Sequence, residues 1–226
     1  MRGNKIKFTR LFDNRFLSLL HITIFMSSCL LTAFLPVTYA FAEKGHAEQI
    51  LEEINLARTD PHGFADFLRE FLGQFQGKSY RLPGSNTMVR TSEGAKGVDE
   101  AIRFLLRQTP LPPLVWSRGL AAAAEELVGE EGKSGSVGHE GKLSGGPAKR
   151  IERHGKWQGM FGENIYYGPG DARLVVMSLI IDDAVPNRGH RKNIFTRKFG
   201  KAGVACGPHP RFLEMCVIDF AGKFDE

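Results

Sequence analysis

Apolar residues recur at helical spacing early in the chain. Between residues 47 and 57 the glutamates lie largely opposite an apolar face, which indicates an amphipathic helix. That apolar face consists of Ile50, Leu51, Ile54 and Ala57. Asp60 and Pro61 then supply an N-cap and a first helical residue, so we expect a second helix that ends at Gly73.

Four more segments are expected to be helical from the same kind of pattern. They cover residues 98–108, 118–130, 148–154 and 172–182. Ser117 and Asp171 stand at the N-cap positions of the second and the last of these, and the prolines after Thr109 end the first. Between residues 74 and 97 the chain is glycine-rich and polar, so we expect an inserted loop there.

Strand patterns dominate the end of the chain. Aromatic and β-branched residues between Met160 and Gly168 predict a strand with Glu163 at its entrance. Residues 199–205 and 214–221 predict two strands that are antiparallel to each other, around a turn at Gly207–Pro210. Helices first and strands late indicate an α+β fold.

Length and charge favour a globular chain and argue against a nucleic-acid partner. With 226 residues, 42% of them hydrophobic, the chain can build one substantial core. The formal net charge is +5, but residues 1–42 alone hold five basic residues and one acid, a net of +4. The rest holds 25 basic and 24 acidic side chains, a net of +1, with no basic run that interleaves with aromatics.

Residues 1–42 are expected to be a signal peptide. Basic residues precede an apolar run from Phe16 to Pro36, and Ala40-Phe41-Ala42 has the small-x-small form of a cleavage site. We therefore expect a single domain over residues 43–226, secreted or periplasmic, with no stable membrane span after cleavage. The alternative is a retained transmembrane anchor, because the apolar run approaches the roughly 20 residues that cross a bilayer.

Two cysteines follow the leader, Cys206 and Cys216. An even pair in an exported chain predicts a disulfide, here across a hairpin. Closing so short a loop would add about 2–3 kcal/mol by restricting the unfolded chain. The competing interpretation is a thiolate metal site, but the spacing does not match the C-x-x-C pattern of a zinc knuckle.

One short stretch, residues 182–195, concentrates titratable groups directly after the apolar run 174–181. It contains Asp182, His190, Arg188 and Arg191. Charged residues directly after a buried element emerge at the surface, where sites are usually built. For the two arginines we favour pairing with Asp182, Asp183 or a carbonyl at a helix end over capture of an anionic group. Four other histidines match no motif and are expected at the surface: His46, His62, His154 and His209.

Several motifs together resemble the CAP superfamily in its bacterial, SCP-like form. They are Trp116-Ser117-x-x-Leu120, Gly138-His139, Gly162-Glu163-Asn164-Ile165, Arg188-Gly189-His190-Arg191-Lys192-Asn193-Ile194 and Gly203-Val204-Ala205. Their order and spacing carry the resemblance, which spans residues 48–222. CAP groups cysteine-rich secretory proteins, venom allergens and plant pathogenesis-related proteins.

The resemblance implies an α-β-α sandwich, in which a small antiparallel sheet lies between helical layers. It also implies a cleft lined by two histidines and two acids. His139 and His190 match the histidines, and Glu163 matches the acid of the Gly-Glu-Asn motif. Asp182 stands where many eukaryotic members have the second acid, three residues after a tryptophan that is Leu179 here. The shorter carboxylate departs from the family pattern.

Two imidazoles and one or two carboxylates in such a cleft could bind a divalent cation such as Zn²⁺, with His139 and His190 as ligands. The resemblance to lipid-binding and defence-related members implies instead a small apolar or cell-envelope ligand, bound by His139, Glu163, Asp182 and His190. A third interpretation is a polar network that only orders the loops.

Catalysis is the alternative function. In a metal-dependent hydrolase of the peptidase or esterase type, His139 and His190 would bind the ion, and Glu163 would act as a ligand or as the general base. A further option is an interaction protein that uses residues 74–97 and the glycine-rich loop at 132–146 as its partner surface. The sequence leaves open whether the chain is an enzyme, because kinship of fold does not decide activity.

Overall fold

The N-terminal half of the described chain is helical, as its periodicity predicts. The computed structural model describes residues 45–82 and 84–226. The helices of this half are α1 (His46–Thr59), α2 (Pro61–Leu72), α3 (Ala95–Leu105) and α4 (Arg118–Ser134). Asp60 and Ser117 are N-caps, since their side chains accept hydrogen bonds from the backbone N–H groups of Gly63 (2.9 Å) and Leu120 (3.2 Å).

The C-terminal half alternates helices with the strands of one four-stranded sheet. Its elements are α5 (Pro147–His154), β5 (Lys156–Tyr167), α6 (Ala172–Ile181), α7 (Gly189–Ile194), β6 (Lys201–His209) and β7 (Leu213–Asp225). The strand order is β4-β6-β7-β5, in which the short strand β4 (Val115–Trp116) runs parallel to β6 and the other neighbours are antiparallel. The expected α+β class is confirmed, and the sheet is mixed through β4 alone.

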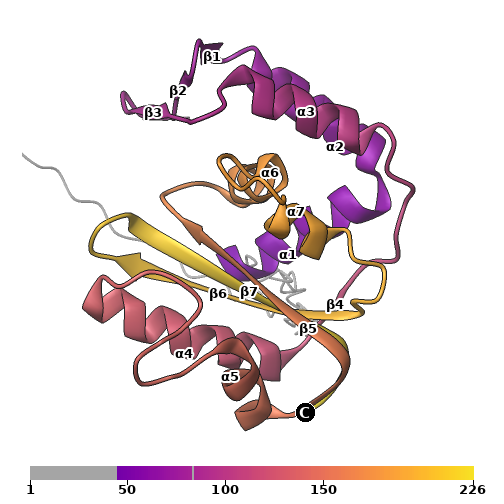
Figure 1. The fold of residues 1–226 in the computed structure, drawn as a ribbon, viewed down its shortest axis with the longest axis vertical. Coiled ribbons are helices and arrows are strands. Elements are labelled where there is room, and N and C mark those ends of the chain that lie inside the picture. The colour runs from indigo at the N-terminus through magenta and orange to yellow at the C-terminus, as the bar shows by residue number, and fades with distance from the viewer. Residues whose placement is uncertain (1–44, 83) are drawn as a thin grey trace, which may run out of the picture. The chain divides into compact units, whose positions relative to one another are not determined.

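Helices cover both faces of this sheet. In Figure 1, α4 and α5 lie on one side, and α1, α6 and α7 lie on the other. Alternating side chains of β7 serve the two layers: Ile218 and Phe220 belong to the core with α1 and α6, whereas Val217 and Ala221 pack with α4. The predicted α-β-α sandwich is therefore confirmed.

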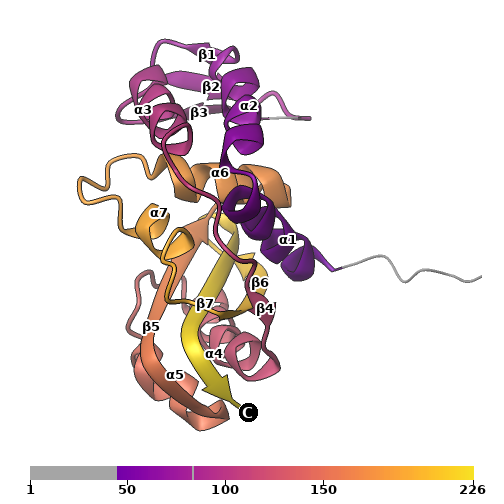
Figure 2. The same cartoon turned by 90° about the vertical axis from the view of Figure 1, so that its right-hand side faces the viewer.

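The segment 74–97 is not the loop that its composition predicts. Three short antiparallel strands form there, β1 (Phe75–Gln76), β2 (Ser79–Arg81) and β3 (Met88–Arg90), and α3 begins before the segment ends. The reason is aromatic packing, because the ring of Tyr80 lies 4.7 Å from that of Phe71 and 5.2 Å from that of Phe75, centroid to centroid. Figure 2 shows these strands beside α2 and α3, beyond α6.

Two expected boundaries near the sheet are corrected, and one short helix was not expected. β5 begins at Lys156, so Glu163 lies well inside the strand rather than at its entrance. Gly207–His209 continue β6, and the turn of the hairpin is at 210–212, because the pairing runs on to His209 opposite Leu213. The short helix α7 was not expected, since its six residues are too few for a periodic pattern.

The predicted disulfide is confirmed. Cys206 and Cys216 are bonded to each other and stand directly opposite on β6 and β7. Cys216 is buried within the main core, and Cys206 packs against the same core while it stays partly exposed. The bridge therefore lies on the face of the sheet that α1 covers.

The described residues fall within one compact unit, Ala42–Glu226. The predicted signal peptide, residues 1–42, lies outside the described ranges. Within those ranges, none of the helices combines the length and the apolar character that crossing a bilayer requires.

A buried arginine joins α1 to two distant loops. The guanidinium of Arg58 donates to the carbonyls of Pro112 (3.0 Å), Ile194 (2.6 Å), Thr196 (3.1 Å) and Phe199 (3.4 Å). Burial, and then the charge of Arg197, lowers the pKa of Arg58 to about 10, so the guanidinium is still protonated at neutral pH. These bonds tie α1 to the segment before β4 and to the segment that runs from the end of α7 toward β6.

We predict that Arg58→Met lowers the free energy of unfolding by about 3 kcal/mol or more, because several buried carbonyls lose their donors at once. Urea denaturation measures the change. Arg103→Met is the matched control: Arg103 is an exposed arginine of α3 that pairs only with Asp99 four residues earlier, so its loss is expected within about 0.5 kcal/mol of the wild type. Equal effects of the two substitutions would contradict the role given to Arg58.

Candidate functional site

The first predicted pair, His139 and Glu163, meets between a glycine-rich loop and the sheet. Nδ1 of His139 lies 2.7 Å from Oε1 of Glu163. The side chain of Glu163 is 2% exposed and that of His139 is 50% exposed. The buried carboxylate thus fixes one nitrogen of the ring, and within the described residues no hydrogen bond involves the other nitrogen, Nε2.

The second oxygen of Glu163 pairs with a buried arginine. Arg150, on α5, directs its guanidinium to Oε2 of Glu163, and it also donates to the carbonyls of His139 (3.1 Å) and Gly145. Arg150 therefore tethers both the carboxylate and the loop that carries His139. The role of Arg150 was not predicted from the sequence, because three basic side chains in one short helix are typical of a solvated surface. A glutamate inside a strand requires a cationic partner, and that requirement could have pointed to Arg150.

A further buried acid, Asp219, lies beside this pair. It stands directly opposite Glu163 on β7, it is fully buried, and neither of its carboxylate oxygens has a hydrogen-bond partner in the described part of the chain. Burial, and then the negative charge of Glu163, raises the pKa of Asp219 well above its ordinary value. This raised pKa favours the neutral form of Asp219 beside the Glu163–Arg150 pair. One acid inside the apolar run Val217–Phe220 was a signal that sequence analysis did not use.

The second predicted pair, His190 and Asp182, forms at the start of α7. Oδ1 of Asp182 lies 2.7 Å from Nδ1 of His190, and Oδ2 accepts the backbone N–H of His190 (2.9 Å) and of Arg191 (3.3 Å). Asp182 itself ends α6 in a left-handed conformation (φ 57°). The short carboxylate thus contacts His190 because the chain turns back on Asp182, and it satisfies free N–H groups of α7.

The edge of β5 connects the two pairs. β5 is an edge strand, and α7 lies against it. Asn193 donates to the carbonyl of Glu163 (3.2 Å) and to the side chain of Asn164 (2.8 Å), while Asn164 donates to the carbonyl of His190 (3.0 Å). Successive residues of a strand face opposite sides of the sheet. The Glu163 pair and the His190 pair therefore flank β5 from its two faces.

These four predicted residues do not form one tight cluster of ligating atoms. Among the residues that it describes, the structure has one group of three or more potential metal-ligating side chains whose atoms lie within 4.8 Å of one another. That group does not include these four residues and consists of His46, Cys206, Glu214 and Cys216. The arrangement is two separate pairs, each with a buried carboxylate behind a partly exposed imidazole.

Both arginines of the charged stretch are structural. Arg188 pairs with Glu93 and Glu100, and Arg191 pairs with Glu100. Each also donates to carbonyls at the end of α6, as expected, for example Arg188 to Asp182 (2.7 Å). The acidic partners are thus glutamates just before and within α3, not Asp182 or Asp183.

Three of the four remaining histidines are not plain surface residues. His209 is buried, where its Nε2 contacts the carbonyl of Ser136 at 2.9 Å. His154 pairs with Glu126 at 2.7 Å, and His46 lies beside the disulfide. The expectation of four surface histidines is therefore wrong for these three; His62 alone is exposed as expected. Expected helix ends and turns suggested exposure, but tertiary packing decides it.

The environment of His139 favours its protonated form. The hydrogen bond to Glu163 raises the pKa of His139 above its ordinary value, against the opposing effects of burial and of Arg150. A cationic, solvent-facing imidazole can donate a hydrogen bond to an anionic group through Nε2. A neutral one could coordinate a metal through the same atom.

Comparison with known families matches residues 51–220 to CAP, the Cysteine-rich secretory protein family. This match covers most of the chain. The chain belongs to the CAP family. The resemblance read from its motifs is thereby confirmed. A search of curated proteins finds no match.

Solved structures similar to this CAP domain come from three bacteria. An extracellular protein with an SCP domain from Bacillus anthracis is 20% identical, with 57% of this chain and 38% of that chain covered and a TM-score of 0.42. An outer surface protein from Borrelia burgdorferi is 18% identical (54% and 86% covered, TM-score 0.42). A cysteine-rich secretory protein from Staphylococcus aureus is 16% identical (69% and 49% covered, TM-score 0.38). The chain thus spans well under half of the Bacillus protein.

We predict that the pKa of His139 in the CAP domain lies above 6.5 and falls when Glu163 is replaced by glutamine, since the charged acceptor is lost. NMR titration of the ring protons measures both. Because the folded pKa is raised, the stability that this pair contributes is fully present below the unfolded pKa of about 6.5 and is lost as the pH rises through the folded pKa. Glu140→Gln, next to His139 but exposed, is the control; a titration equally altered there would contradict the assignment.

We also predict that Asp219→Asn stabilises the CAP domain at pH 7. A buried acid with a raised pKa takes up a proton on folding, so its contribution to stability is lost as the pH rises from about 4 through the folded pKa. Asparagine needs no proton, so the urea midpoint of the variant should exceed that of the wild type at pH 7, and by less at pH 4. The exposed Asp225→Asn serves as control on the same strand. A lower midpoint at pH 7, with no dependence on pH, would refute the neutral state of Asp219.

Proposed function

We propose that the chain is a secreted binding module of the CAP family, and that its site takes an anionic group of a small cell-envelope ligand. One observation carries the proposal: both His139 and His190 are held at Nδ1 by a buried carboxylate, and within the described residues neither Nε2 has a hydrogen-bond partner. Such preorganisation lowers the entropy lost on binding. Extracellular and outer-surface proteins among the structural neighbours are consistent with secretion.

The charge of the site favours an anion over an apolar ligand. The His139 ring is biased toward the cation, and Arg150, which is itself buried, neutralises Glu163 behind it. Glu163 and Asp182 serve as supports for the rings in this arrangement. A phosphate or a carboxylate of a wall component would therefore meet a donor rather than a bare negative charge.

A divalent cation is the second candidate for the same site. A histidine that donates Nδ1–H to a carboxylate is oriented as metal-ligating histidines usually are. The fit is limited, however, because both oxygens of Glu163 are engaged by His139 and Arg150, and both oxygens of Asp182 are engaged at the start of α7. Only two imidazole nitrogens remain as protein ligands, fewer than the three or four of usual zinc sites.

The same engagement argues against Glu163 as a general base. Its carboxylate already accepts from a ring nitrogen and from a buried guanidinium, so abstraction of a proton would require the Arg150 pair to break. Hydrolysis is therefore not the function that this geometry favours.

We predict that inorganic phosphate, used as the simplest anionic probe, binds the protein more weakly as the pH rises through the pKa of His139. His139→Ala should weaken binding by about 10-fold or more, the equivalent of one charge-assisted hydrogen bond. Isothermal titration calorimetry at several pH values gives the dissociation constants, with His62→Ala as a control.

Titration with Zn²⁺ separates the two candidates, because a metal competes with protons for the ring and binds more tightly as the pH rises. Phosphate binding that ignores both His139→Ala and pH would refute the anion site. Zinc binding to the oxidised protein that requires both His139 and His190 would favour the second candidate.

A further inference from the structure

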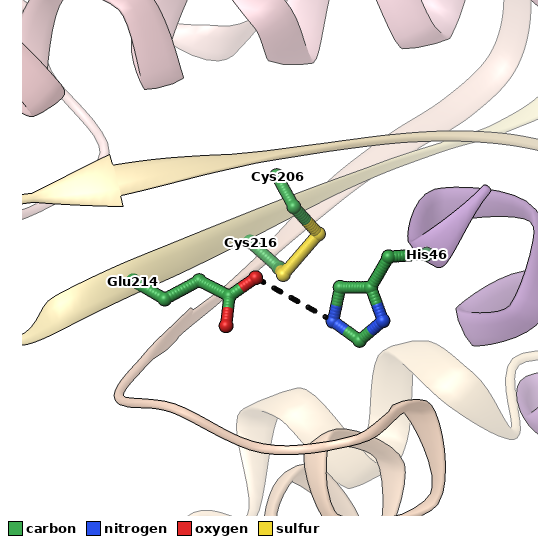
Figure 3. Close-up of side chains that lie close together, drawn as sticks. All are labelled: His46, Cys206, Glu214 and Cys216. Atoms are coloured by element: carbon green, nitrogen blue, oxygen red, sulfur yellow. Dashed lines mark ion pairs between the residues drawn. A yellow bond between two sulfur atoms is a disulfide. The ribbon is translucent and has the colours of Figure 1, made fainter. Parts of the chain in front are cut away.

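Four potential metal ligands converge at the N-terminal end of α1. Atoms of His46, Glu214, Cys206 and Cys216 all lie within 4.8 Å of one another. Figure 3 shows the imidazole of His46 and the carboxylate of Glu214 on either side of the two sulfurs. The four residues come from α1 and from the paired strands β6 and β7. They are separate from the His139 and His190 pairs.

His46 is incompletely satisfied in the disulfide form. Among the described residues its buried Nε2 has no hydrogen-bond partner, and Oε1 of Glu214 lies 3.6 Å away, at the distance of an ion pair rather than of a hydrogen bond. A buried imidazole nitrogen without a partner is costly, so its presence calls for an explanation. A ligand placed between the imidazole, the carboxylate and the sulfurs would supply that partner.

The strand register brings the two cysteines together although their spacing in the sequence differs from that of a zinc knuckle. Cys206 and Cys216 are ten residues apart, unlike the cysteines of a zinc knuckle. They are, however, directly opposite on neighbouring antiparallel strands, and Glu214 is two residues before Cys216 on the same strand and so faces the same side of the sheet. The register thus brings three ligands to one face, where α1 adds His46.

We propose that reduction of the Cys206–Cys216 disulfide converts this cluster into a Zn²⁺ site with two thiolates, one imidazole and one carboxylate as ligands. Such a soft, mixed ligand set suits Zn²⁺. Zinc–sulfur bonds of about 2.3 Å in a tetrahedral arrangement place two sulfurs about 3.8 Å apart, a separation that free thiolates on opposed residues can reach. While the disulfide is intact, neither sulfur is a thiolate and the site is closed to the metal.

The reductant is an external dithiol. One of its thiolates attacks Sγ of Cys206, the more exposed cysteine, which forms a mixed disulfide and releases Cys216 as a thiolate. The second thiol of the reagent then attacks the reagent sulfur that is bonded to Cys206, which closes the reagent's disulfide and releases Cys206. Two electrons pass to the protein, the dithiol leaves as a disulfide, and the cysteine protons go to solvent when Zn²⁺ binds.

The test compares the oxidised protein with protein reduced by a dithiol and freed of reagent under anaerobic conditions. Co²⁺ is added first, because thiolate ligation to cobalt gives a characteristic charge-transfer absorption, and Zn²⁺ is then used to displace it. We expect one Co²⁺ per chain with thiolate absorption in the reduced protein and no such absorption in the oxidised protein. Cys206→Ser/Cys216→Ser should also lack it.

Single substitutions distinguish Zn²⁺ binding by all four ligands from Zn²⁺ binding by the two cysteine thiolates alone. His46→Ala and Glu214→Gln should each weaken Zn²⁺ binding to the reduced protein by at least about 10-fold, the low end of the cost of losing even an outer partner of a metal ligand. His62→Ala, which removes an exposed histidine elsewhere, should leave it unchanged. Affinity that is the same in wild type, His46→Ala and Glu214→Gln would overturn the proposal.

Reduction could loosen the fold, so thermal unfolding is followed by circular dichroism in the same samples. If the reduced protein has a lower unfolding midpoint, Zn²⁺ should raise that midpoint, because a metal that binds only the folded state stabilises it. The double serine variant should not respond. Equal responses of the reduced wild type and the serine variant, or none in either, would overturn the proposal whether or not reduction disturbs the fold.

Discussion

The buried ion pair of Arg150 and Glu163 is the constraint on which the rest of the site depends. Two charges are removed from water there, and such a pair is favourable only when further hydrogen bonds satisfy the remaining donors and acceptors. Glu163 uses its other oxygen for His139, and Arg150 uses Nη1 for two carbonyls of the glycine-rich loop, while its buried Nε has no partner among the described residues. The same bonds that make the charges tolerable therefore fix the position of the imidazole. Ordering a glycine-rich loop costs much conformational entropy, and these bonds offset that cost.

Asp219 shows how closely the charge of this layer is balanced. One guanidinium can neutralise one carboxylate, and two ionised acids directly opposite on adjacent strands would repel each other in a dry environment. Burial and the charge of Glu163 raise the pKa of Asp219, which favours its neutral form beside the Arg150–Glu163 pair. The hydrogen bond between His139 and Glu163 outweighs burial and the charge of Arg150, which is why the pKa of His139 rises rather than falls on partial burial.

The sequence was informative where local rules decide the structure and uninformative where distant packing does. Caps at Asp60 and Ser117, the apolar α6 and the cysteine pair follow from neighbouring residues, and the motifs identified His139, Glu163 and His190 before any geometry was known. Arg150 and Asp219 could not be found in that way, since their roles arise only when α5 and β7 meet β5. The small sheet at 75–90 was missed for the same reason: its aromatic contacts reach back to Phe71.

The two histidine pairs solve one problem with different local means. Glu163 lies in a strand and needs a long side chain and an arginine from another helix to hold its ring, whereas Asp182 is one residue past the end of α6 and is held by the free N–H groups of α7. A shorter carboxylate is sufficient there because the backbone turn at Asp182, with φ 57°, brings the acid to the ring. The aspartate at this position is thus compatible with an intact pair. The side chains of Asn193 and Asn164 then tie the two pairs together across the edge of β5, so any ligand that contacts both rings must match a spacing that these side-chain hydrogen bonds help to set.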